Sequence, residues 1–217
     1  MLSIPVSIGE AIDKYSILMI KKTKIQDKSK LKNIDEEIKL LYPHLESVLS
    51  KYNYHYTCLY NINCDIWELS DCVRDPTLSI EFKNTLFLET FNKNDARFRI
   101  KSKLNKLTSS NLQEQKSYPG NTILLKSQDN FEIYNKRNTY IRYLTFCYDY
   151  VIIECPIDSI LIKVKILFND DPHIIIVKKC VVNYSLIQDL NVTPEPICNL
   201  LCKYDFTNSK PLIINYL

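Results

Sequence analysis

The segment NDARFRIKSKLNKLTSSNLQEQKSY, residues 94–118, is the most informative one for predicting the fold of this chain. It is highly charged, favours a helix for most of its length and closes on a short polar tail. The turn signal SYPGN follows at residues 117–121. Beyond it, the helical spacing of apolar residues gives way to short apolar runs. We therefore predict a boundary near Pro119, with one domain over residues 1–118 and a second over residues 119–217.

The first domain is predicted to be a helical bundle. Apolar residues recur at helical spacing over about 7–24, 29–48, 59–73 and 77–106. Ser7 and Glu10 match a capping box at the start of the first helix. Pro43 should kink or restart the second helix, and Pro76 should end the third. We expect a break in the fourth helix near residues 92–94. Four helices with short links predict an antiparallel bundle or two long hairpins.

The second domain is predicted to be a small α/β layer. Strands are expected at residues 122–126, 150–154, 173–182 and 211–216, and helices at 135–149, 157–168 and 195–203. Alternating strands and helices indicate right-handed crossovers on a mostly parallel sheet, and so a Rossmann-like layer. The chain stops directly after an apolar run, which suggests that this domain is incomplete. The predicted fold class is therefore α+β or α/β, with a helical bundle followed by a Rossmann-like layer.

Composition excludes several classes of function. The formal net charge is only +3, so a dedicated nucleic-acid binder is not expected. The chain holds 2 glycines and neither GxGxxG nor GxxxxGK[ST], so the standard phosphate-binding loops are missing. No apolar run exceeds four residues, and we predict no membrane span.

The cysteines do not predict a metal site. There are 8 of them, but no C-x-x-C pair, and the spacing of His55, Cys58 and Cys64 matches no recognised zinc ligand set. We expect neither a metal nor another cofactor. The N-terminus lacks the basic and then apolar pattern of a secretory signal, so we expect reduced thiols and a cytoplasmic location.

Several motifs in the first domain recur together in a known family. They are PVSIGE at residues 5–10, Asp13-Lys14, ILMIK at residues 17–21, Asn94-Asp95, Arg97, Lys101, Asn105, Glu114 and KSY at residues 116–118. With these motifs the domain resembles an uncharacterised bacterial helical family found beside glycosyltransferases in surface-polysaccharide gene neighbourhoods. That family has no agreed activity, so the resemblance implies a context and no catalytic residue.

The second domain resembles the N-terminal, Rossmann-like half of a GT-B glycosyltransferase. The similarity rests on NTYIRYL at residues 138–144 and YDYVII at residues 148–153. Such transferases often carry a Gly-x-Gly-Asp turn after the first strand. Residues 126–129 correspond to that turn, with Asp129 present and both glycines missing. The resemblance also implies that most of the nucleotide-sugar site lies in a second half that this chain lacks.

Four residues of the second domain are candidates for a ligand pocket. They are Asp129, Asn130, Arg142 and Glu154. Open parallel sheets bind ligands at the carboxyl ends of their strands, and these residues fall at or beside those ends. The more ordinary interpretation, which we favour, is surface polarity and helix capping.

A basic run lies on the predicted fourth helix. It consists of Lys93, Arg97, Arg99, Lys101, Lys103 and Lys106. Such a run can bind phosphate, an anionic glycan or an acidic partner. The interpretation we favour is a solvated helix face, since most charge runs are of that kind. Arg97 and Lys101 are nevertheless carried forward as candidate binding residues.

The polar tail after this helix supplies three further candidates, Glu114, Lys116 and Tyr118. Segments at the ends of elements often carry function. The equally weighted alternative is a helix C-terminus that satisfies its own carbonyl groups.

Charged residues of the first and fourth helices also predict a structural contact. Asp13, Lys14, Asp95 and Arg97 are expected to form a buried polar network between the two helices. Such a network sets the register of the helices and carries no reactivity.

The expected function is that of a glycosyltransferase-like module of a glycan-biosynthesis protein, which binds an acceptor or a partner without carrying full catalysis. A nucleotide sugar or glycan acceptor is the expected ligand. The alternative is a non-enzymatic scaffold that binds a protein partner or forms a homodimer. The homodimer would use the apolar stripe of the third helix, formed by Leu59, Ile62, Ile66, Leu69 and Val73. No residue is assigned a catalytic role.

Overall fold

The computed structural model describes residues 4–115, 122–126, 130–179 and 186–189. The chain divides into two compact units, residues 1–115 and residues 116–217. The predicted boundary at Pro119 falls outside the described residues. Within them, no helix is long and apolar enough to cross a membrane.

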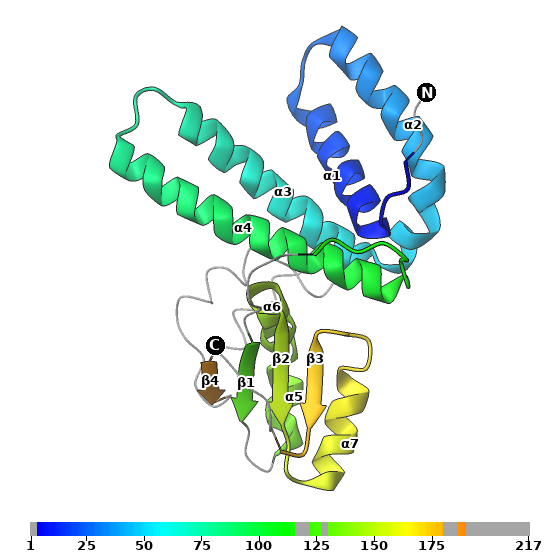
Figure 1. Cartoon of the computed structure of the whole chain (residues 1–217), viewed down its shortest axis with the longest axis vertical. Coiled ribbons are helices and arrows are strands. Elements are labelled where there is room, and N and C mark those ends of the chain that lie inside the picture. The colour runs from blue at the N-terminus through cyan, green and yellow to red at the C-terminus, as the bar shows by residue number, and fades with distance from the viewer. Residues whose placement is uncertain (1–3, 116–121, 127–129, 180–185, 190–217) are drawn as a thin grey trace. The chain divides into compact units, whose positions relative to one another are not determined.

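The first unit is a bundle of four helices (Figure 1). They are α1 (Ile8–Lys24), α2 (Lys28–Lys51), α3 (Asn53–Arg74) and α4 (Ile80–Leu107). The chain forms two helical hairpins, α1–α2 and α3–α4, and α1 packs against both helices of the second hairpin. The helical bundle predicted for this part of the chain is confirmed.

Neither α2 nor α4 is divided where a restart or a break was expected. Helix α2 continues through Pro43, and α4 continues through residues 92–94. In α4 the polar side chains bond to their own helix: Asn94 Nδ2 donates to the Thr90 carbonyl at 3.0 Å, and Thr90 Oγ1 donates to the Leu86 carbonyl at 2.8 Å. Such bonds keep polar side chains within a continuous helix. Helix α3 ends at Arg74, directly before Asp75-Pro76, as predicted.

The core of the first unit lies where α1, α3 and α4 meet. Ile12, Leu59, Ile62, Ile100 and Leu104 are all at most 1% exposed. Leu59 and Ile62 belong to the stripe of the third helix that was expected to form a homodimer. These first two residues of the stripe are covered by the bundle's own helices, whereas Ile66, Leu69 and Val73 are only partly buried, and the homodimer stays a prediction.

The second unit is a small parallel sheet with helices. The strands are β1 (Thr122–Lys126), β2 (Tyr150–Glu154), β3 (Ile174–Val177) and β4 (Leu186–Asp189), and the helices are α5 (Phe131–Lys136), α6 (Asn138–Cys147) and α7 (Asp158–Leu167). The strand order is β3-β2-β1-β4, and every neighbouring pair is parallel. A bundle followed by a small α/β part with a parallel sheet is therefore confirmed.

Some elements of the second unit differ from the prediction. The helix expected over residues 135–149 is two helices, because Arg137 leaves helical geometry between α5 and α6. The strand β3 ends at Val177, and β4 was not predicted. The helix expected at residues 195–203 and the strand at 211–216 lie outside the described residues.

Candidate functional site

The start of α1 is held by the end of α4. The Gly9 amide donates to Asn105 Oδ1 at 2.7 Å, and the Ile8 amide donates to Ser110 Oγ at 3.3 Å. Ser7 caps its own helix, because its Oγ accepts from the Glu10 amide at 3.2 Å. The first amides of a helix have no partner within it, and here three of them find side-chain acceptors. Ser7 fulfils its half of the predicted capping box.

Gly9 permits this close approach of α1 and α4. A Cβ atom at this position would lie 2.6 Å from the Lys101 carbonyl oxygen and 2.9 Å from Asn105 Oδ1. Both distances are shorter than van der Waals contact allows. The backbone torsion φ of Gly9 is in an ordinary region, so the position does not need the conformational freedom of glycine. It needs glycine because a larger side chain would not fit against α4.

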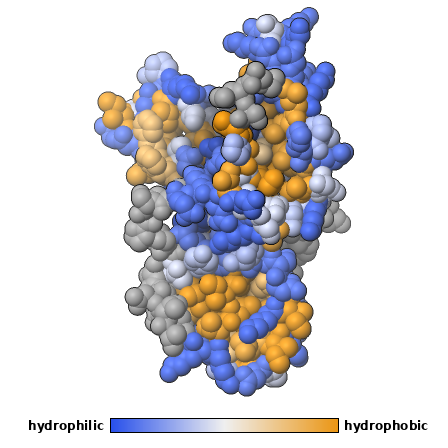
Figure 2. All heavy atoms as spheres, turned by 45° about the vertical axis from the view of Figure 1, so that its right-hand side comes forward, coloured by the Kyte–Doolittle hydropathy of each residue, from blue (hydrophilic) through white to orange (hydrophobic). Residues whose placement is uncertain are grey.

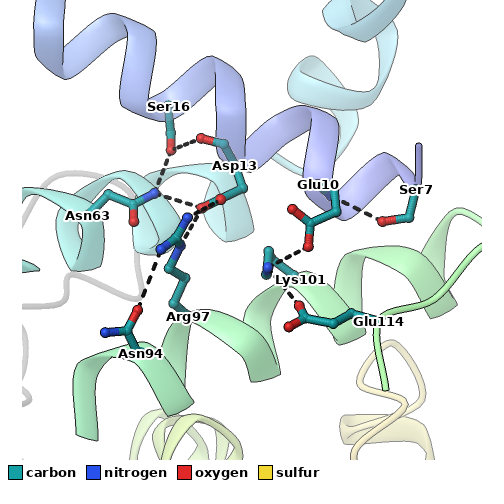
Figure 3. A network of polar contacts seen from close by, with 9 residues as sticks. All are labelled: Ser7, Glu10, Asp13, Ser16, Asn63, Asn94, Arg97, Lys101 and Glu114. Atoms are coloured by element: carbon teal, nitrogen blue, oxygen red, sulfur yellow. Dashed lines mark hydrogen bonds and ion pairs between the residues drawn. The ribbon is translucent and has the colours of Figure 1, made fainter. Parts of the chain in front are cut away.

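One turn further along α1, Asp13 is the centre of a buried hydrogen-bond network (Figure 3). Arg97 Nε donates to Asp13 Oδ1 at 2.8 Å, and Arg97 Nη2 contacts Asp13 Oδ2. Asn63 Nδ2 donates to Asp13 Oδ1 at 2.9 Å and to Ser16 Oγ at 2.7 Å. The bond to Asp13 raises the pKa of Arg97 above its usual value. Helices α1, α3 and α4 are thereby joined through one carboxylate.

The predicted contact between Asp13 and Arg97 is confirmed, but Lys14 does not belong to the network. Lys14 lies on the outer side of α1 and pairs with Glu37 of α2 at 2.7 Å. Its side chain is 62% exposed, whereas that of Asp13 is 4% exposed. Neighbouring residues of one helix point about 100° apart, so only one of the two can face α4.

Lys101 forms the second node of the same network (Figure 3). Its Nζ lies 2.5 Å from Glu10 Oε1 and 2.7 Å from Glu114 Oε2. Burial lowers the pKa of Lys101, but the hydrogen bonds to the two carboxylates outweigh burial and raise it. Lys101 is therefore protonated and cannot act as a general base. Glu10, which the capping box would direct to Ser7, is bonded to Lys101.

Most of the basic run on α4 is buried. Lys93, Arg99, Lys101 and Lys103 are each less than a tenth exposed. Lys93 Nζ forms an ion pair with Asp65 of α3 at 2.7 Å. The interpretation of this run as a solvated helix face is wrong. The sequence of α4 alone does not show that carboxylates from other parts of the unit pair with Lys93 and Lys101 inside the bundle.

The network brings together three of the predicted site residues, Arg97, Lys101 and Glu114. Lys116 and Tyr118 lie outside the described residues. The sequence reasoning overlooked Asn63, although a signal for it exists. This amide interrupts the apolar stripe of α3 beside Ile62 and is only 4% exposed. A lone polar residue in such a stripe needs a buried partner.

The candidate pocket residues of the second unit do not all lie at one end of the sheet. Asn130 caps α5, because its Oδ1 accepts from the Glu132 amide at 3.0 Å. Glu154 is the last residue of β2, at the carboxyl end of the sheet. Asp129 lies outside the described residues. The favoured interpretation of helix capping is thus correct for Asn130.

Arg142 clamps two helices together, away from the carboxyl ends of the strands. Its Nη2 donates to the Leu167 carbonyl at 3.0 Å and to Asp170 Oδ1 at 2.8 Å, and its guanidinium lies 5.4 Å from the centre of the Phe168 ring. These partners are at the end of α7, which leads into the amino end of β3. Arg142 is therefore separated from Glu154 by the length of the strands.

The chemistry of these groups favours positioning over bond making. The cations Arg97 and Lys101 are paired with carboxylates of other segments, and such pairs hold α1 and α4 in one arrangement. Among the described residues, no group of three or more His, Cys, Asp or Glu side chains could hold a metal ion.

Comparison of the chain with protein-family models, with curated proteins and with solved structures finds no match.

Proposed function

We propose that the chain is a glycosyltransferase-like module of a glycan-biosynthesis protein that binds an acceptor glycan or a partner without catalysing transfer itself. The observation that carries this proposal is the convergence of the motif residues. Those that support the resemblance, at residues 7–13 and 97–114, lie far apart in the sequence and meet in one network (Figure 3). A network of this kind fixes one arrangement of the helices, as a preformed binding surface requires.

The second unit supports the same proposal through its strand order. The order β3-β2-β1-β4 matches the first four strands of the doubly wound order 3-2-1-4-5-6, and we propose a Rossmann-like layer for this unit on that ground. In such sheets the ligand site lies at the carboxyl ends of the strands where the strand order reverses. Here the strand order reverses between β1 and β4. Two candidate residues lie near that point: Asn130 follows β1, and Glu154 is the last residue of the adjacent strand β2.

Isothermal titration of the full chain tests the proposal. The ligands are a panel of UDP-sugars and GDP-sugars and, separately, acceptor glycans. We expect saturable heat with an acceptor and at least about a tenfold loss of affinity in Glu154→Gln, which is the effect of about 1.4 kcal/mol. The matched control, Glu36→Gln on the exposed side of α2, should bind like the original protein. A panel that produces no heat would contradict the proposal.

A non-enzymatic interaction module is the second candidate, and a different observation favours it. Hydrophobic side chains reach the surface in both units (Figure 2), and among the exposed ones are Phe87, Leu88 and Phe91 of α4. Exposed apolar patches of this kind mark protein–protein contacts. Static light scattering separates the candidates, because a scaffold would associate without any sugar present.

A further inference from the structure

Helix α4 ends in a tight reversal of the chain. The Ser109 amide donates to the Lys106 carbonyl at 3.2 Å, and the Ser110 amide donates to the Asn105 carbonyl at 2.9 Å. These two bonds form a Schellman motif, whose turning residue Ser109 has a φ of 52°. Glycine is the usual residue there, because a Cβ atom raises the energy of this backbone conformation. We call the residues that follow this turn, 110–115, the strap.

The strap runs back along α4 and is held near both of its ends. Ser110 Oγ accepts from the Ile8 amide at 3.3 Å, and Glu114 Oε2 lies 2.7 Å from Lys101 Nζ (Figure 3). Lys101 precedes Ser109 by eight residues, which is about 12 Å along a helix. The five residues from Ser109 to Glu114 span about 17 Å when extended, so the strap reaches Lys101 with little slack.

Between these two contacts the strap is weakly anchored. Residues 111–115 are exposed and form neither helix nor strand, and Leu112 is 44% exposed. The Leu112 carbonyl accepts from Ser110 Oγ at 3.0 Å, which is a bond within the strap itself. Exposed segments with few buried contacts open locally at a low cost in free energy. The contacts at the two ends therefore matter most for keeping the strap in place.

Lys101 keeps a carboxylate when the strap leaves. Its Nζ also lies 2.5 Å from Glu10 Oε1, which belongs to α1. The Lys101 side chain is 10% exposed and that of Glu114 is 38% exposed. Release of Glu114 returns a partly exposed carboxylate to water and leaves the buried ammonium paired with Glu10. Release of Arg97 from Asp13, by contrast, would leave a carboxylate that is only 4% exposed without the guanidinium.

We propose that the strap is a latch, which opens and closes while the rest of the network stays in place. The first unit ends at Gln115, and the chain continues directly into the second unit. With the latch closed, the first unit holds the chain as far as Glu114. With the latch open, it holds the chain only as far as Ser109. Opening therefore adds residues 110–114, up to about 17 Å of extended chain, to the connection between the units.

Hydrogen exchange of the full chain, followed by NMR, provides the first test. The Ile8 amide bonds to the strap, whereas the Gly9 amide bonds to α4 and is the internal reference for the folded unit. We expect Glu114→Ala to raise the ratio of the Ile8 to the Gly9 exchange rate at least about fivefold, because a hydrogen bond to a charged group is lost. Gln113→Ala is the matched control at the neighbouring exposed position and should leave the ratio unchanged. An unchanged ratio in Glu114→Ala would show that the two end contacts are independent, and would overturn the latch.

The other carboxylate of Lys101 provides the second test, with the opposite sign. In Glu10→Gln, opening would leave the Lys101 ammonium without either carboxylate, so the ratio should fall below that of the original chain. Raising the salt concentration from about 0.05 M to about 0.5 M should raise the ratio in the original chain and not in Glu114→Ala, where the pair is already absent. A ratio that rises in Glu10→Gln, or that responds to salt equally in both chains, would contradict the proposal. Titration with sugars does not depend on the latch and tests the glycan proposal separately.

Discussion

At the scale of single residues, the packing of the first unit depends on a few positions that tolerate only one side-chain size or charge. Gly9 lies against the backbone of α4, and Asp13 accepts hydrogen bonds from two other helices. Both residues belong to short motifs at the start of the chain. The motifs can be seen in the sequence. What requires glycine and aspartate at these two positions is a contact with α4, more than eighty residues away in the chain.

Gly9→Ala should destabilise the protein even though alanine is the better helix former. The gain in helix propensity is at most about 1 kcal/mol, whereas overpacking costs about 1–3 kcal/mol when the neighbouring atoms cannot move. The nearest neighbour is a backbone oxygen at 2.6 Å, so overpacking should dominate. We expect the free energy of unfolding in urea to fall by about 1–2 kcal/mol. Ser47→Ala, at an exposed position of α2, is the control and should be neutral or stabilising. An equally stable Gly9→Ala variant would refute the close contact.

Asp13→Asn should be strongly destabilising, because it leaves the Arg97 guanidinium without its carboxylate. Removing one partner of a buried ion pair costs about 3–5 kcal/mol, and we expect the lower end because the Arg97 side chain is 25% exposed. The adjacent residue provides the control. Lys14→Gln breaks only an exposed pair and should cost less than about 1 kcal/mol. Urea unfolding of both variants measures the difference, and similar losses would count against the network.

At the scale of elements, α4 combines three environments along one helix. Its first three turns carry exposed apolar side chains such as Phe87 and Phe91, its middle forms the ion pairs of Lys93 and Arg97, and its end holds the start of α1. Its sequence shows no single apolar stripe, because buried lysines and arginines replace apolar residues on the packed side. Periodicity alone therefore could not reveal which side of this helix is buried.

The buried state of Lys93 can be tested against Lys83 of the same helix, which is only partly buried. Lys93→Met leaves Asp65 charged and buried, and should lower the free energy of unfolding by about 3 kcal/mol. Lys83→Met, two to three turns earlier, should change it by no more than about 0.5 kcal/mol. In the double variant Lys93→Met/Asp65→Leu, most of the loss should be recovered, since no unpaired charge remains. If Lys93→Met behaved like Lys83→Met, the lysine would be solvated as first interpreted.

At the scale of the whole molecule, the chain consists of two compact units with different architectures. The buried side chains of α1, α3 and α4 cover one another, and all contacts of the network described above lie within residues 7–114. The first unit thus has a core and a polar network of its own, which are the features of an independently folding domain.

We expect a fragment of residues 1–115 to fold alone. Circular dichroism should show a helical spectrum and a single cooperative thermal transition. Asp13→Asn should lower the midpoint of that transition, as the network predicts. A fragment without a cooperative transition, or one that is insensitive to Asp13→Asn, would show that the network needs the rest of the chain.

The helices of the first unit, and β1, β2 and β3 among the four described strands of the second, could be predicted from the sequence. These elements follow from local quantities: the spacing of apolar residues, the proline after Asp75 and the β-branched run at residues 174–177. It did not predict β4, a short strand with no apolar run of its own to mark it. Nor could it decide whether Lys93 or Arg142 faces water, a ligand or another helix.

Which polar groups meet could be learned only from the packing of the helices. Asp13 and Lys14 are neighbours in the sequence, yet one is buried against Arg97 and the other is exposed beside Glu37. The difference arises from the direction in which α1 crosses α3 and α4, and that direction depends on the close contact at Gly9. The burial of a charge is a property of everything packed around it, so no pattern within a single helix can determine it.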